Sequence, residues 1–112
     1  SDERKNVMMM NFDQDEKLAV VKAIAETIEL DKKYKVGELM YLDELMETLD
    51  FDMQFVEDAR ALSSIKAVST LRSMSDEKKK ALIIIIDKMT EADGVVHKKE
   101  TDFVVNLVSI LQ

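Results

Sequence analysis

The chain has 112 residues, and its 23 acidic and 16 basic side chains leave a formal net charge of −7 at pH 7. This charge argues against a nucleic-acid-binding protein, because such proteins hold phosphates through clustered Lys and Arg. The absence of Cys excludes disulfides, thiolate metal ligands and a Cys nucleophile, and the absence of Pro with only two Gly argues against an all-β fold rich in turns.

The N-terminal part of the chain predicts an arm followed by a helix. Residues 1–12 are charged and then rich in Met, and we expect them to form a flexible arm ahead of a single helical domain over 13–112. Asp13 and Glu16 form a capping-box pattern, which predicts a helix from about Gln14 to Leu30.

Further helices follow along the chain. A second helix is predicted over 36–49, with an inward stripe of Leu39, Leu42, Leu45, Met46 and Leu49. Residues 53–74 carry the spacing of either one helix or two, with "LSS" as the point where the chain would break. Ser75 is a suitable N-cap for a helix over 76–92, and a last helix is predicted over 97–111.

Two apolar stretches, "ALIIII" and "DFVVNLVSIL", are rich in β-branched residues and are candidates for strands. In the second stretch, however, Asp102, Asn106 and Ser109 recur at helical spacing. We therefore predict an all-α fold, a compact bundle of five to six helices in which the isoleucine run belongs to a central helix. The apolar stripes contain no ionisable residue, so an apolar interior is expected.

An internal repeat relates the two halves of the chain. At an offset of 62 residues, three acidic residues of the first turn coincide with acidic residues of the second, and apolar positions on both sides also match. This predicts a bundle built from two pseudo-repeated helical hairpins. The matched pairs are Glu29 with Glu91, Asp31 with Asp93, Glu38 with Glu100, Val20 with Leu82, Ile24 with Ile86, Leu45 with Leu107 and Leu49 with Leu111.

The second hairpin turn, "EADGVVHKKE", resembles the back half of a calcium-binding EF-hand loop. With Gly94 at the loop's sixth position, Glu100 takes the twelfth, but the first falls on Met89, which offers no oxygen. One interpretation is a turn with Asp93 and Glu100 in hydrogen-bonding roles at helix ends. The other is a calcium or magnesium site that pools carboxylates of both turns, namely Glu29, Asp31, Glu38, Glu91, Asp93 and Glu100.

The stretches "TEADGVVHKKETDFVVNL" and "MSDEKKKALIIIIDKMTEADG" resemble the helix–turn–helix signature of the tellurite-resistance TerB-like family. The resemblance extends over about residues 13–111. It implies a compact cytoplasmic helical bundle, linked to tellurite and other stress responses, that binds partners or ions rather than catalysing a reaction. It also implies acidic residues at the two turns, here Asp31, Glu38, Asp93 and Glu100. The first turn departs from the pattern, because Lys32 stands where Gly is usual.

From these observations we expect a non-enzymatic TerB-like binding or scaffold protein with no resident cofactor. Its partner would be an unidentified protein or a second copy of the chain, and neither nucleic acid nor membrane insertion is expected. Two alternatives stay open: a divalent-metal-binding protein, and a metal-dependent enzyme. Helical-bundle metalloenzymes use Glu-x-x-His pairs, whereas the only His, His97, follows Gly94 at that spacing.

Overall fold

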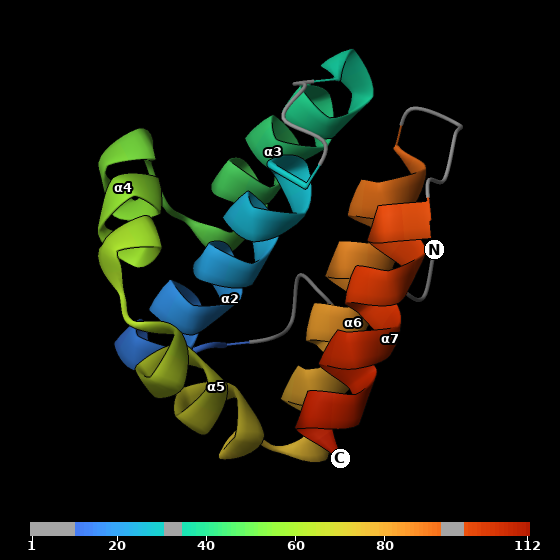
Figure 1. Cartoon of the computed structure of the whole chain (residues 1–112). Coiled ribbons are helices and arrows are strands. Elements are labelled where there is room, and N and C mark those ends of the chain that lie inside the picture. The colour runs from blue at the N-terminus through green and yellow to red at the C-terminus, as the bar shows by residue number, and fades with distance from the viewer. Residues whose placement is uncertain (1–10, 31–34, 93–97) are drawn as a thin grey trace.

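The computed structural model describes residues 11–30, 35–92 and 98–112, and this part of the chain is all-α (Figure 1). The prediction of an all-helical bundle is confirmed, and no strand occurs in the described ranges. Both stretches considered as strands are helical. The helices are α2 (Gln14–Ile28), α3 (Val36–Leu49), α4 (Met53–Ala61), α5 (Ser64–Arg72), α6 (Asp76–Glu91) and α7 (Lys98–Leu111).

Residues 53–74 contain two helices, which settles the question that the sequence left open. The break lies at Leu62, whose extended backbone (φ −64°, ψ 138°) ends α4. Ser63 then begins α5, because its side-chain oxygen accepts a hydrogen bond from the Lys66 amide at 3.2 Å. The "LSS" sequence therefore turns the chain by capping a new helix, as a Ser at an N-cap commonly does.

The predicted N-caps of α2 and α6 are confirmed. The Asp13 carboxylate accepts from the Glu16 amide at 2.7 Å, and the Asp13 amide donates to the Glu16 carboxylate at 2.9 Å, which completes a capping box. Ser75 caps α6 by accepting from the Lys78 amide at 3.3 Å. These caps fix where α2 and α6, the two central helices, enter the bundle.

The core is centred on α2 and α6, which pack against each other while α4 and α5 cover α2 (Figure 1). Val20 and Ile24 of α2 have 0% exposure, and so do their repeat partners Leu82 and Ile86 of α6. The repeat is thus reproduced in the burial of its apolar positions. Phe12, which falls within the predicted N-terminal arm, is also buried; residues 1–10 of that arm lie outside the described part of the chain.

The two hairpins differ in how their helices pack. α7 lies closely along α6, whereas α3 makes its main backbone contacts with α6 and few with α2, its neighbour in sequence. An opening is therefore left between α2 and α3, bounded on its other side by α4. Within the described residues, no helix has both the length and the apolar character needed to cross a membrane.

Candidate functional site

The acidic residues predicted from the two turns do not share one environment. Asp31 and Asp93 lie outside the described residues. Glu91 ends α6 and is exposed, and Glu29 follows the last residue of α2. The remaining two, Glu38 and Glu100, lie in the first turns of α3 and α7 and are each 2% exposed.

Glu100 is held by an ion pair that links the two hairpins. The Lys35 ammonium lies 3.1 Å from the Glu100 carboxylate, with side-chain exposures of 16% and 3%. Lys35 immediately precedes α3, so this contact places the beginnings of α3 and α7 at the same end of the bundle (Figure 1). The ammonium offsets part of the cost of burying the carboxylate.

The described part of the predicted metal site contains no group of three or more carboxylates or His side chains arranged to hold an ion. Glu29 instead pairs with Arg60, at 2.8 Å. The full set of six carboxylates includes two outside the described residues, so the metal site stays a prediction. What the structure adds is that Glu38 and Glu100 are buried, which corrects the expectation of an interior without ionisable residues.

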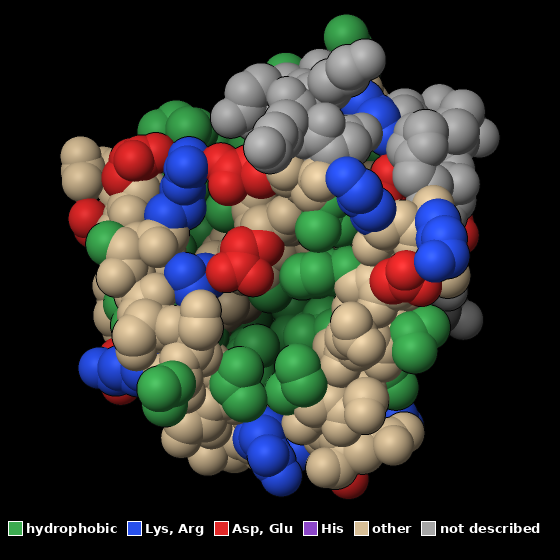
Figure 2. Space-filling model, viewed as in Figure 1, with side chains coloured by type: hydrophobic (Ala, Val, Ile, Leu, Met, Phe, Trp, Pro, Cys, Tyr) green, Lys and Arg blue, Asp and Glu red, His purple; other side chains and the backbone are tan. Residues whose placement is uncertain are grey.

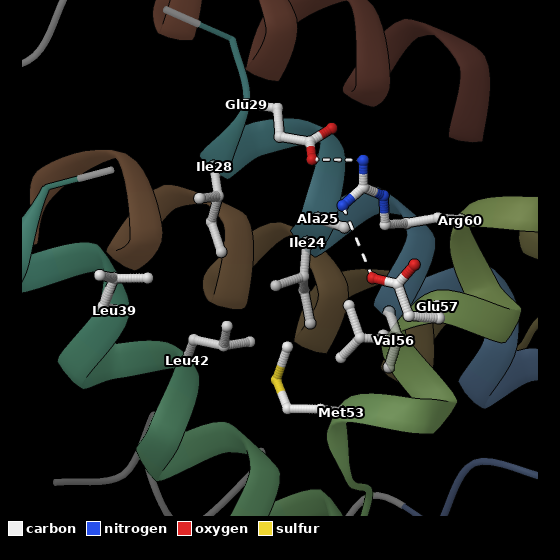
Figure 3. A pocket seen from close by; sticks show the side chains of 11 residues that line it. Ile24, Ala25, Ile28, Glu29, Leu39, Leu42, Met53, Val56, Glu57 and Arg60 are labelled. Carbon is white, nitrogen blue, oxygen red and sulfur yellow. Dashed lines mark ion pairs between the residues drawn. The ribbon is translucent and has the colours of Figure 1, made fainter. Parts of the chain in front are cut away.

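A second candidate site is an apolar groove of about 250 Å³ between α2, α3 and α4, which we call the α2–α4 groove (Figure 3). Aliphatic side chains of α2, including Ile24 and Ile28, form its floor. Leu39 and Leu42 of α3 line one wall, and Met53 and Val56 of α4 line the other (Figure 3). The groove is the opening that results because α3 stands away from α2.

The charged residues of the groove are joined to one another along one side. Arg60 of α4 lies 2.8 Å from the Glu29 carboxylate and 3.7 Å from that of Glu57, so the guanidinium bridges α2 and α4 (Figure 3). The Arg60 carbonyl also accepts a hydrogen bond from the Lys22 ammonium at 3.1 Å. These contacts tie α4 to α2 and leave the remaining groove surface apolar.

Large hydrophobic side chains are exposed on the two helices, α3 and α4, that form the walls of this groove. Of the seven such side chains in the described residues, four belong to α3 or the beginning of α4: Val36 (73% exposed), Met40 (69%), Met53 (54%) and Leu39 (43%). Leu39 and Met53 also line the groove itself. Exposed apolar side chains that line a groove are typical of a binding site for another molecule.

The same segment carries most of the surplus charge. Residues 35–61 contain eight acidic and two basic side chains, which accounts for six of the seven surplus negative charges of the chain. Seven of these acidic side chains are exposed, and both basic ones form ion pairs, Lys35 with Glu100 and Arg60 with Glu29 and Glu57. The α2–α4 groove is thus an apolar surface whose two wall helices, α3 and α4, belong to the most acidic segment of the chain.

A smaller hollow of about 110 Å³ lies between α2, α5 and α7, where Figure 2 shows hydrophobic side chains gathered below a pair of charged ones. Val68, Phe103 and Ile110 are among its lining residues. At its edge the Lys22 ammonium lies 3.4 Å from the Glu26 carboxylate. Its lining residues carry no comparable excess of one charge.

Sequence reasoning missed the groove because it assigned Leu39 and Leu42 to the core. That assignment is wrong for Leu39, which is 43% exposed, whereas Leu45 and Leu49 of the same stripe are buried as expected. The sequence does signal an exposed apolar surface on α3, because Val36 and Met40 lie on the side opposite the buried leucines, where an ordinary surface helix carries polar residues. No protein-family model, curated protein or solved structure matches this chain.

Proposed function

We propose that this protein is a non-catalytic TerB-like binding module that holds an apolar segment of a partner protein in the α2–α4 groove. The proposal rests chiefly on the apolar lining of the groove, to which Leu39 and Met53 contribute although each is also exposed to solvent. A monomeric surface seldom presents such side chains next to one another unless another molecule covers them.

The ion pairs among the charged side chains of the groove favour a binding function over a catalytic one. Glu29, Arg60 and Glu57 are engaged with one another in ion pairs. A general acid or base must instead lie within hydrogen-bonding distance of the reacting group of a substrate. In this arrangement the three residues brace α4 against α2, and the apolar walls provide the contact area.

The proposal is tested with a library of displayed random peptides of about 16 residues, long enough for about four helical turns. Enriched peptides should bind the wild-type chain and lose at least tenfold in affinity for Met53→Glu. Met53 is the first residue of α4 and half-exposed, so a Glu there suits the helix N-terminus and should not disturb folding.

Ile65→Glu is the matched control, because Ile65 is 86% exposed on α5, away from the groove. Peptides should bind this variant as they bind the wild type, and circular dichroism should show both variants folded. Enrichment of peptides that bind Met53→Glu undiminished, or no enrichment at all, would contradict the proposal.

A second candidate function, binding of a divalent cation, is favoured by one observation. The repeat-related residues Glu38 and Glu100 are both buried, and the described structure gives Glu100 an ammonium as its counter-ion. If cations compete with Lys35 for these carboxylates, millimolar calcium or magnesium should raise the melting temperature more in Lys35→Met than in the wild type. Equal melting temperatures with and without each ion, in both proteins, would rule out this function.

A further inference from the structure

We infer that the occupant of the α2–α4 groove is an amphipathic helix that carries Lys or Arg beside its apolar face. This inference rests on the proposed function and adds the chemistry of the partner. It follows from the shape of the groove, the side chains on its walls and the charge of the segment to which its wall helices belong.

The shape favours a helical ligand over an extended one. The groove is bounded by three helices, and no strand edge exists among the described residues to pair with an extended peptide. Grooves between helices receive the apolar face of another helix, whose side chains at positions i, i+3, i+4 and i+7 enter as anchors. Leu39 of α3 and Met53 of α4 lie on opposite walls of the groove and are both exposed, so such anchors would pass between them.

Methionine is well suited to this position. Met53 lines the groove and Met40 is exposed on α3, the helix that forms the opposite wall, and the unbranched thioether side chain adapts to partners of different shape. In contrast, Met74 and Met89 are buried and belong to the core. They therefore serve as internal references for contacts at the groove.

The acidic side chains of α3 favour a partner helix that carries basic residues. Asp43 and Glu47 follow Val36 and Met40 at helical spacing, so they continue the same exposed side of α3 beyond its apolar part. A bound helix with Lys or Arg next to its anchors would place these groups against carboxylates. Such complementarity at the rim of an interface favours the correct partner and repels acidic ones.

A second copy of the chain is a weaker candidate for the occupant than a basic helix, because the segment that would form the contact is acidic. In a two-fold dimer through this groove, the segment 35–61, with its six surplus negative charges, would face an identical segment. Like charges placed opposite each other across an interface oppose association. The groove therefore favours a partner of the opposite charge.

The test uses three synthetic helical peptides with the same Leu and Met anchors and with Lys, Gln or Glu at the flanking positions. Fluorescence anisotropy should show the Lys peptide binding about tenfold more tightly than the Gln peptide, since each exposed ion pair adds a factor of about 1.5 to 5. The Glu peptide should bind more weakly still, and the advantage of Lys should shrink at high salt.

Two charge variants locate the effect. Asp43→Asn combined with Glu47→Gln should lower the affinity for the Lys peptide towards that for the Gln peptide and leave the latter unchanged. Asp76→Asn combined with Glu77→Gln makes the same change of charge at the beginning of α6. This control should alter neither the affinity for the Lys peptide nor that for the Gln peptide.

Methyl NMR spectra provide a second measurement. The signals of Met40 and Met53 should shift on binding, whereas those of Met74 and Met89 should stay unchanged.

The outcomes separate this inference from the proposed function. If the three peptides bind equally and all lose affinity for Met53→Glu, the groove is a binding site but the basic partner is wrong. If no peptide binds, both the inference and the proposed function fail. Concentration-dependent dimerisation that Met53→Glu abolishes would identify a second copy as the occupant and overturn the inference.

Discussion

Replacing Lys35 by Met should destabilise the fold well beyond the cost of an ordinary surface charge. Lys35 supplies the ammonium 3.1 Å from the Glu100 carboxylate, and Glu100 is 2% exposed. With the ammonium removed, a buried carboxylate would keep its charge without this partner. Met is chosen because it retains much of the length and apolar character of the lysine side chain.

The expected loss follows from the burial of the two partners. Removing one member of a buried ion pair costs about 3–5 kcal/mol. The Lys35 side chain retains 16% exposure, so solvent already weakens the pair and the lower end, about 3 kcal/mol, is expected. In a domain of this size the melting temperature should fall by about 10 °C.

Urea unfolding followed by circular dichroism measures the change, provided that the slope of the transition is unaltered. The double variant Lys35→Met with Glu100→Met should recover to within about 1 kcal/mol of the wild type, because an apolar pair replaces the ionic one. Lys98→Met is the control: its ammonium lies 3.7 Å from Asp102 but is 92% exposed, so its loss should stay within about 0.5 kcal/mol. A loss below about 1 kcal/mol for Lys35→Met, or no recovery in the double variant, would refute the reasoning.

Three further predictions concern stability and use the same assay. Ile86→Ala should cost about 3–4 kcal/mol, because Ile86 is 0% exposed, whereas Ile65→Ala, at an 86% exposed position, should change little; similar losses would contradict the assigned core. Asp50 has φ 57°, so Asp50→Val should cost about 1–2 kcal/mol and Asp50→Gly should be tolerated, and the reverse order would argue against the left-handed turn after α3. Ser63→Ala should cost about 1 kcal/mol through loss of the α5 cap, and no loss would show that the cap is dispensable.

The helical bundle and its repeat could be predicted because local signals and burial agree. Asp13 and Ser75 have side chains that cap helices, and the apolar positions after them recur at helical spacing. The offset of 62 residues pairs Val20 with Leu82, both fully buried. Composition alone made strands improbable, and the isoleucine run lies in α6, where Ile85 and Ile86 are fully buried in the core.

The burial of Glu38 and Glu100 could have been predicted from the same spacing. Glu38 precedes the buried residues Leu45 and Leu49 by seven and eleven positions, and Glu100 precedes Leu107 and Leu111 by the same intervals. Each glutamate therefore lies on the inward side of its helix. An acidic residue in a first helical turn is, however, ordinarily explained by the helix dipole alone, so this position does not by itself indicate burial.

The groove could not be predicted, because it depends on tertiary packing rather than on helical spacing. The pattern of α3 shows which residues lie on one side of the helix but not which neighbour that side meets. In the structure the inward side of α3 packs mainly on α6, so Leu39 remains partly exposed at the groove. The separation of α3 from α2 is a property of the whole bundle.

That separation predicts a difference in dynamics between helices of equal length. α3 and α7 have 14 residues each and are related by the repeat, but α7 packs on both α5 and α6, whereas α3 packs mainly on α6. Backbone amides open more readily where fewer contacts hold a helix, so hydrogen exchange should be faster in α3 than in α7. A bound basic peptide should slow exchange in α3 and leave α7 as the internal control. Equal exchange in the two helices of the free protein would mean that α3 is as firmly packed as α7, and the groove would then be a rigid feature rather than one that adapts to its ligand.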